Sequence, residues 1–379
     1  MYGISPLMRM RAEQEQLLRG VRSLLPEIQE EALELDRTAQ FPHASLQRLA
    51  ALGLLTATLP ETLGGLGFGY GEQGASALLR LFMALGEASL PITRLYEAHV
   101  NALQLIVRYG SETLAAGCAG DAGQNHIFAL WVTDPPGREL ALEPVGSRYV
   151  LRGIKDFCSG AGTATRALIT AADATGTRML VVRLQPESRV LQSRIRLGGM
   201  RAAVTGSVDF SGMQVEPEDL IGQAGDYLKE PVFSAGAWRG SAAALGGLAA
   251  LVQLHRDQIL QRGREGDPHQ QARFGQCAIA HETARLWMER AARLACVEDD
   301  RAEAVVAYVN LARLAVEAVC LEAMQLAQRS LGLSGFIAGS RMELLCRDLA
   351  TYLRQPAPDE TLTKAAAFYF ANGIVDREN

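Results

Sequence analysis

A glycine pattern near the first quarter of the chain is the first feature that could support chemistry. Gly69-Tyr-Gly-Glu-Gln-Gly74 matches GxGxxG, the spacing with which a strand-to-helix turn holds a dinucleotide diphosphate. That chemistry requires a strand before the glycines and a second strand with an acidic residue about 20 residues later. Helical sequence lies on both sides of the motif, so the sequence argues against a dinucleotide site of this kind.

The six histidines and six cysteines are too scattered to indicate a metal site. No cysteine pair forms CxxC and no histidine pair forms HExxH. We therefore predict no metal. Widely separated cysteines fit reduced thiols better than a disulfide framework, which favours a cytoplasmic location.

Charge and hydrophobicity argue against two classes of partner. The formal net charge of -5 provides no basic field for a nucleic-acid backbone. The longest apolar stretch, Ala242–Leu254, is shorter than the about 20 residues of a membrane-spanning helix, so we expect no membrane partner. A chain of 379 residues with 48% apolar content has material for more than one structural unit.

The periodicity of apolar residues divides the chain into three parts. Residues 1–124 repeat apolar positions at intervals of three and four, as in Ala77–Leu85, which predicts an α-helical domain. Residues 125–222 contain short branched or alternating runs separated by Gly, Pro and Asp, which predict a small antiparallel β-domain. Residues 223–379 return to helical periodicity and predict a helical bundle. This order predicts an α+β fold class.

The individual elements follow from the same patterns. Strands are predicted at His126–Thr133, Tyr149–Ile154, Ala167–Ala172, Met179–Leu184 and Ser207–Val215. The C-terminal helices are predicted at Ala235–Arg262, Gln270–Cys296, Ala302–Leu331, Met342–Leu353 and Thr361–Phe370.

Four short motifs accompany this order of elements. They are Leu59-Pro-Glu-Thr-Leu-Gly-Gly-Leu-Gly67, Leu130-Trp-Val-Thr-Asp-Pro135, Lys155-Asp-Phe-Cys-Ser-Gly160 and Leu331-Gly-Leu-Ser-Gly-Phe336. With the order of the three parts, they resemble the acyl-CoA dehydrogenase superfamily. The resemblance implies an N-terminal helical domain, a middle β-domain and a C-terminal four-helix bundle. It also implies an FAD-dependent oxidoreductase that dehydrogenates an acyl thioester or related small molecule and passes electrons to an acceptor.

The two motifs of the middle part resemble the family's flavin site. In the family, the first strand binds the isoalloxazine ring through its backbone and a threonine hydroxyl. The second segment ends in an aromatic residue that packs on the flavin and a Ser or Thr that bonds it. A flavin needs an apolar wall and preset donors, and a β-edge can supply both. The resemblance implies flavin contacts from Trp131, Val132, Thr133, Phe157, Cys158 and Ser159. Alternatively, Phe157 belongs to the core and Ser159 to a turn.

The C-terminal part resembles the family site for the FAD diphosphate of a neighbouring subunit. Leu331–Phe336 resembles the glycine-rich turn of that site, and Phe274-Gly275 keeps the end of an Arg-x-x-Phe-Gly stretch in which Gln271 replaces the arginine. The resemblance therefore implies a homodimer or homotetramer. The alternatives are a helix C-cap and solvated arginines around a loop. The implied cofactor residues are Arg262, Arg264, Arg273, Phe274, Arg329 and Gly332.

The catalytic carboxylate of the family is missing from its usual place. In most members it lies nine residues after the arginine that corresponds to Arg347, and that position is Pro356 here. A minority place it on the first bundle helix, near Ala237, where no acid stands. Asp359 and Glu360 follow shortly after and are the candidate substitutes. Alternatively, both acids only favour the dipole at a helix N-terminus.

A second branch of the superfamily suggests different chemistry. Its two-component monooxygenases take reduced flavin from a flavin reductase, need no such glutamate, and often carry a Lys-x-Phe-x-Ser-Gly segment that Lys155–Gly160 resembles. In that branch a histidine of the first domain and a serine of this segment help form a flavin hydroperoxide, which implies His99 and Ser159. The alternatives are thus a dehydrogenase, a monooxygenase or a non-catalytic flavin-binding homologue.

The substrate side also departs from the family. Asp134–Leu140 stands where most members have a Gly-Ser-Asp contact to acyl-CoA. We expect Trp131, Trp238 and Arg239 to shape the substrate pocket, since the resemblance places Arg239 near an arginine that borders the active site.

Overall fold

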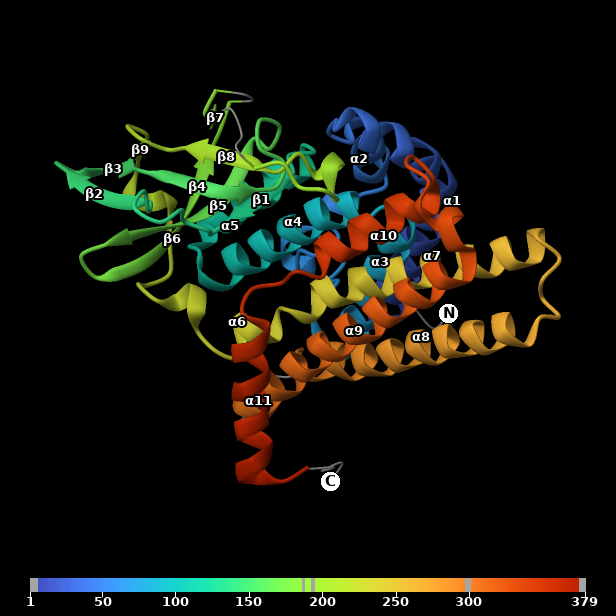
Figure 1. Ribbon diagram of the computed structural model, residues 1–379. Helices are drawn as coiled ribbons and strands as arrows, with labels where there is room; N and C mark the ends of the chain where they lie inside the picture. Colours follow the sequence, from blue (N-terminus) through green and yellow to red (C-terminus); the bar gives the residue numbers. More distant parts are fainter. Residues whose placement is uncertain (1–5, 186–187, 192–194, 297–300, 375–379) are drawn as a thin grey trace, which may run out of the picture.

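The computed structural model describes residues 6–185, 188–191, 195–296 and 301–374. The first residues of the predicted N-terminal domain and the last residues of the predicted C-terminal domain lie outside these ranges. The described chain forms helices, then strands, then helices, which confirms the predicted α+β class. Figure 1 shows the strands gathered at one end of the molecule and the long helices at the other. The N-terminal helices are α1 (Pro6–Thr38), α2 (His43–Ala51), α3 (Gly71–Ala88), α4 (Leu90–Tyr109) and α5 (Glu112–Gly123).

The β-part contains two sheets within the described residues. Its strands are β1 (Phe128–Trp131), β2 (Ala141–Val145), β3 (Arg148–Arg152), β4 (Ile154–Cys158), β5 (Arg166–Asp173), β6 (Gly176–Arg183), β7 (Val190–Leu191), β8 (Gly206–Asp209), β9 (Gln214–Val215) and β10 (Leu220–Ile221). One sheet has the order β10-β6-β5-β2-β3-β9 with β1 also paired to β5, and the other has the order β4-β8-β7.

The β-domain is mostly antiparallel, as predicted, but two of its strand pairs are parallel. β1 pairs with β5 in parallel, with Phe128 opposite Arg166, and β2 meets β5 in parallel at Ala141 and Ala172. Parallel pairing needs a long crossover, and the three strands between β1 and β5 supply it. The remaining pairs are antiparallel, such as β5 with β6.

The C-terminal part is helical, as predicted. Its helices are α6 (Val232–Ala235), α7 (Trp238–Gln261), α8 (Pro268–Leu294), α9 (Ala302–Leu331), α10 (Arg341–Tyr352) and α11 (Pro358–Asn372). α7, α8 and α9 pack together, α10 packs on α7, and α11 contacts α9 while pointing away from the strands (Figure 1). Among the described helices, α9 with its following turn has the length and apolar composition of a membrane span. Val309, Val316 and Ala323 of α9 are nevertheless fully buried in the helical core.

The N-terminal helices and the bundle share one core, because α3 crosses α7 at very short range. A Cβ placed on Gly86 would lie 2.2 Å from the carbonyl oxygen of Ala243, and one on Gly246 would lie 2.1 Å from that of Met83. Only glycine fits such an approach. The crossing leaves α4 between the β-part and the bundle, in contact with β1 and with α7.

Candidate functional site

The ends of β1 and β4 meet at one edge of the β-part, so the two predicted flavin motifs lie together. The Asp156 N–H donates to the carbonyl of Thr133 at 2.9 Å, and the two residues form an isolated antiparallel bridge. The fully buried Lys155 braces this edge, because its Nζ donates to Asp134 Oδ1 at 2.6 Å and to the carbonyl of Val132 at 3.3 Å. Burial lowers the pKa of Lys155, and the hydrogen bond to Asp134 opposes that shift.

Phe157 is turned outward at a strained point of β4. Its φ is 55°, which is rare for a bulky side chain, and the β4–β8 register shifts between Lys155 and Cys158. The ring is 52% exposed, so the alternative that Phe157 belongs to the core is wrong. Strained backbone of this kind clusters at ligand sites. Thr133 is exposed at the same edge. The edge therefore offers an apolar ring, a hydroxyl and strand backbone.

Two other predicted contacts turn their side chains into the protein. Trp131 is 2% exposed, packs against Phe210, and donates its Nε1–H to the carbonyl of Ser159 at 2.9 Å. Cys158 is fully buried, which raises the pKa of its thiol. Both can offer a ligand only backbone groups, and the prediction that the Trp131 ring shapes a substrate pocket is wrong. The side chain of Ser159 is also largely buried.

His99 is structural, and its prediction as a catalytic residue is wrong. The Phe128 N–H donates to His99 Nδ1 at 3.0 Å, so in the neutral ring Nε2 carries the proton and donates to the carbonyl of Leu55 at 2.7 Å. The ring is fully buried, and burial lowers its pKa to about 4. Neither nitrogen is free to act on a substrate or a flavin.

The predicted substitutes for the base face solvent. Asp359 and Glu360 are exposed in the first turn of α11. The Glu360 carboxylate pairs with Lys364 Nζ at 2.6 Å along the helix surface, and that hydrogen bond lowers the pKa of Glu360. Acids at such a position stabilise the helix N-terminus. Within the described chain, neither acid therefore faces the other predicted site residues at the β1–β4 edge, and the helix-terminus alternative accounts for both.

The residues predicted to bind the diphosphate gather where α7 and α9 end. Some of their side chains already have partners within the chain, and others are exposed. Arg262 Nη1 donates to the carbonyl of Leu331 at 3.3 Å, which joins the end of α7 to the glycine-rich turn. Gly332 begins that turn with a φ of 63°, and Arg329 beside it is exposed. Arg264 is held by Asp267 at 2.5 Å.

Arg273 and Phe274 follow on the first turns of α8. Phe274 lies beside the buried His255, with 6.1 Å between ring centroids. The positive charge of Arg273 adds to the effect of burial, and together they lower the pKa of His255 to about 4. The structure thus places the predicted arginines around one end of the bundle.

A polar cluster lies between α4, α7 and α10, and Arg239 is its only member that the sequence predicted to be near the site. It consists of Arg94, Glu97, Asn101, Gln104, Arg239 and Tyr352, and we call it the α4–α7–α10 cluster. Its four α4 members are spaced by three, four and three residues, which places them on one face of a mostly buried helix. That spacing was the available signal. The spacing alone did not indicate a cluster, because the partners on α7 and α10 are far away in sequence.

Glu97 is the buried carboxylate of this cluster. It is 7% exposed, and its Oε2 accepts hydrogen bonds from Arg94 Nη1 at 3.0 Å and from the Tyr352 hydroxyl at 2.8 Å. Burial and then the negative charge of Glu97 raise the pKa of Tyr352 well above its ordinary value. A Cβ on Gly240 would lie 3.2 Å from Glu97 Oε1, so α7 approaches the carboxylate through a glycine.

Arg239 occupies the other end of the cluster with uncharged partners. Its Nη1 donates to Asn101 Oδ1 at 2.8 Å, and its Nη2 donates to Gln104 Oε1. Burial lowers the pKa of Arg239 to about 10. Gly69 of the GxGxxG motif gives Gln104 room, because a Cβ there would lie 2.5 Å from Gln104 Nε2. The motif runs from a turn into the first residues of α3, and 3-10 helix rather than a strand precedes it, which agrees with the expectation that no dinucleotide site lies there.

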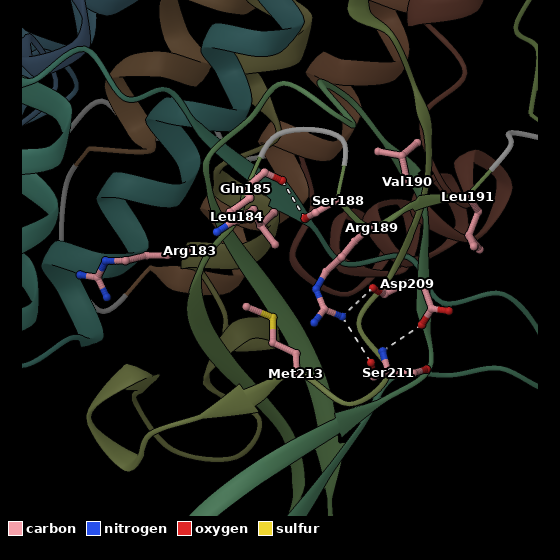
Figure 2. A pocket seen from close by; sticks show the side chains of 10 residues that line it. All are labelled: Arg183, Leu184, Gln185, Ser188, Arg189, Val190, Leu191, Asp209, Ser211 and Met213. Carbon is pink, nitrogen blue, oxygen red and sulfur yellow. Dashed lines mark hydrogen bonds between the residues drawn. The ribbon is translucent and has the colours of Figure 1, made fainter.

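An open pocket of about 640 Å³ lies elsewhere, on the β-part. Figure 2 shows its lining, with Arg189 directed at the backbone of Asp209 and Ser211. Arg189 Nη1 donates to those two carbonyls at 3.2 and 3.3 Å. No predicted site residue lines this pocket, and its central arginine is occupied by the backbone. We therefore place the candidate site at the β1–β4 edge and the α4–α7–α10 cluster.

Known proteins resemble the chain at the level of sequence and fold. Residues 11–117 match the family described as Acyl-CoA dehydrogenase, N-terminal domain. The cyclohex-1-ene-1-carbonyl-CoA dehydrogenase of Geobacter metallireducens is 26% identical over 89% of this chain and 92% of its own length. This chain belongs to the acyl-CoA dehydrogenase superfamily.

Other relatives of this superfamily member are named for different chemistry. L-evernosamine nitrososynthase of a Micromonospora species is 31% identical over 68% of this chain, a match that spans 63% of that enzyme. The structure of KijD3 with dTDP has a TM-score of 0.84 at 20% identity and covers 97% of this chain and 98% of its own. A second KijD3 structure contains FMN and a dTDP-linked amino sugar, with a TM-score of 0.81 at 21% identity, covering 100% and 96%.

The helices of the cluster lie near the Lys155–Gly160 motif and near Pro356. A Cβ on Gly160, directly after Ser159, would lie 3.3 Å from Leu95 Cδ2, so the end of the flavin motif rests on α4. Tyr352 ends α10 four residues before Pro356, the superfamily's usual position for the base. Glu97 of α4 is linked to this part of the chain through its hydrogen bond with Tyr352.

Proposed function

We propose that the chain is a flavin-dependent monooxygenase that uses reduced flavin and oxygen. The observation that carries this proposal is the placement of the dehydrogenase base. Pro356 takes its usual position, and Asp359 and Glu360 lie in an exposed helical turn. α,β-Dehydrogenation needs a base within hydrogen-bond reach of the substrate proton. A monooxygenase does not need that carboxylate, and the 31% identical relative named as a nitrososynthase supports the same direction.

The flavin ring fits the β1–β4 edge. Phe157 presents an exposed ring there, Thr133 offers a hydroxyl, and the backbone of residues 131–133 and 157–159 offers donors and acceptors. Reduced flavin bound at this edge would supply the electrons that activate oxygen. The isoalloxazine ring is common to FAD and FMN, and KijD3 has been solved with FMN. Arg262 and the Gly332 turn would serve the diphosphate that only FAD carries.

The residues of the chain have separate tasks in this proposal. Phe157 and Thr133 orient the ring, and the Lys155–Asp134 contact keeps β1 and β4 together beneath it. His99 fixes the position of β1 on α4. The α4–α7–α10 cluster is the polar part of the site on the helical side, where it would meet the substrate. The Tyr352 hydroxyl donates a hydrogen bond to Glu97 there.

The test compares oxygenation with dehydrogenation in the same preparation. The protein is supplied with FAD or FMN, a flavin reductase and NADH, and small amines and sulfur compounds are screened by mass spectrometry for an added oxygen. A separate anaerobic sample of oxidised, flavin-loaded protein is mixed with acyl-CoAs of several chain lengths. We expect oxygenated products and no bleaching of the flavin. Bleaching by an acyl-CoA would identify a dehydrogenase, and failure to bind either flavin would leave a non-catalytic homologue.

A variant links the oxygenase test to the proposed flavin edge. Phe157→Ala removes the exposed ring and should weaken flavin binding about tenfold, since stacking on an aromatic side chain contributes roughly 0.5–1.5 kcal/mol beyond burial. The control is Phe233→Ala, another exposed phenylalanine that lies on α6. Equal flavin affinity of the wild-type and Phe157→Ala proteins would contradict the placement of the ring.

A further inference from the structure

The α4–α7–α10 cluster contains more positive than negative charge. Arg94 and Arg239 face one carboxylate, Glu97, and Arg94 already occupies it through a 3.0 Å hydrogen bond. Glu97 Oε2 also accepts a hydrogen bond from the Tyr352 hydroxyl. Among the described residues, no carboxylate lies within 4.0 Å of the Arg239 guanidinium. Arg239 is therefore a half-buried cation without an anionic partner.

The hydrogen bonds of Arg239 leave several donors free. A guanidinium has five N–H groups, and two of them are used by the side-chain oxygens of Asn101 and Gln104. Its Nε is buried without a hydrogen-bond partner in the described chain. A desolvated cation is stable only when an anion or a full set of acceptors compensates it. The two amides orient the guanidinium without neutralising it.

Glu97 compensates Arg239 only from a distance. Its negative charge opposes the effect of burial on the pKa of Arg239, but within the described chain the two groups form no direct ion pair. Arg94, one turn away on α4, and Tyr352 from α10 both bind the same oxygen of the carboxylate. Asn101, one turn further along α4, is instead a direct hydrogen-bond partner of the Arg239 guanidinium. The cluster thus keeps one cationic end and one anionic end apart.

We propose that Arg239 binds an anionic oxygen group of the substrate, either a carboxylate or a phosphate. The planar guanidinium fork suits both groups and can hold either through two parallel hydrogen bonds. The bound molecule is the substrate only if the proposed oxygenase function holds, so this inference rests on that function. The binding itself can be measured without turnover.

The experiment measures ligand binding by calorimetry on the full chain supplied with excess FAD. The probes share one alkyl chain and differ only in their head group: hexanoate, hexyl phosphate, hexylamine and hexanol. We expect at least one of the two anions to bind more tightly than hexanol and hexylamine. The anion that binds with the higher affinity, hexanoate or hexyl phosphate, shows whether the site prefers a carboxylate or a phosphate. Tighter binding of hexylamine, or no preference for either anion, would overturn the proposal.

Variants then assign the binding to Arg239. Arg239→Gln should weaken the preferred anion by about tenfold or more, the usual contribution of a charge-assisted hydrogen bond, and leave hexanol unchanged. Arg256→Gln is the matched control, because Arg256 is an exposed arginine of the same helix. Unchanged anion affinity in a folded Arg239→Gln protein would overturn the assignment.

A second variant tests the same proposal if the Arg239→Gln protein does not fold. Asn101→Asp has almost the same shape and places a carboxylate on the atom that already lies 2.8 Å from Arg239 Nη1. It should fold, neutralise the arginine and abolish anion binding. Retained binding would overturn the proposal. No probe is oxidised in this assay. The binding results therefore test the anion site separately from the oxygenation assay, and either test can fail without the other.

Discussion

His99 connects three segments of the molecule through both ring nitrogens. It receives the N–H of Phe128 at the start of β1 and donates to the carbonyl of Leu55, while its own backbone belongs to α4. Its full burial explains why a histidine expected at an active site performs a structural task. A residue type that suits catalysis is therefore no evidence of catalysis when both of its polar atoms are already bound.

Replacement of His99 by alanine should destabilise the fold. The change leaves two buried backbone groups without partners, and each costs about 1–3 kcal/mol, so the free energy of unfolding should fall by roughly 2–6 kcal/mol. Urea denaturation followed by circular dichroism measures the loss. His269→Ala is the control, since His269 is exposed at the start of α8 and should change little. A stable His99→Ala protein without activity would instead indicate a catalytic role.

The buried histidines predict that stability falls in acid. The pKa values of His99 and His255 are lowered from 6.5 to about 4. Between these values the unfolded chain binds protons that the folded chain does not, so stability decreases as the pH drops from 6.5 towards 4. Both His255 nitrogens lack partners in the described chain. His255→Leu should therefore reduce this pH dependence without loss of stability at pH 7, as measured by urea titrations across the range. An unchanged slope would contradict the assignment.

The crossing of α3 and α7 joins the N-terminal helices to the bundle. Gly86 and Gly246 each face a backbone carbonyl of the other helix at a distance that excludes a Cβ. α4 and its polar face are consequently held against the start of α7, where Arg239 and Gly240 stand. The geometry of the candidate site depends on this contact.

A methyl group at the crossing should force the two helices apart. Gly246→Ala should lower the free energy of unfolding by about 1–3 kcal/mol, the usual cost of overpacking, although alanine is the better helix former. Gly117→Ala is the matched control, because Gly117 lies inside α5 with nothing within 4 Å of its Cβ direction. That control should be neutral or stabilising by up to about 1 kcal/mol. Thermal unfolding of both variants tests the contrast, and equal effects would contradict a tight crossing.

Local patterns predicted the elements better than their contacts. The α9 bounds, Ala302–Leu331, follow from regular apolar spacing, which a long amphipathic helix shows by itself. β2 and β4 were not predicted as separate strands, because short strands around a bulge carry little periodicity. The bulge at Phe157 also explains why a local motif could identify the flavin edge but not which side chains face outward.

The candidate site was predictable only where its residues are close in sequence. The β1 and β4 motifs are short, so their resemblance to the family's flavin site could be recognised in the sequence. The Glu97–Tyr352 bond joins residues 255 positions apart, and the Arg239–Asn101 bond spans 138. No local pattern records such pairs. The helical packing that brings them together arises from the whole core.

The described surface of the molecule exposes large apolar side chains at one end of the bundle. Leu333, Phe336 and Ile337 are 89%, 58% and 60% exposed, all in or just after the turn that follows α9. Arg262 binds the base of the same turn. Exposed apolar groups of this density indicate an interaction surface. They suit the contact with a second copy that the sequence resemblance implies, and such a contact would bring the arginines of one subunit to the flavin of another.

Disruption of this surface should have two effects in the same variant: the subunits should separate, and FAD should be retained less strongly. Phe336→Asp places a charge where a second copy would bury an aromatic ring, and burial of an unpaired charge is strongly unfavourable. We expect light scattering to show a shift to monomer, with weaker retention of FAD because the diphosphate site would be incomplete. Val145→Asp is the control, since Val145 is similarly exposed at the end of β2, distant in sequence from the turn. A wild-type protein that is already monomeric would contradict the shared site. A Phe336→Asp monomer that retains FAD at wild-type affinity would instead show that one subunit holds the cofactor alone.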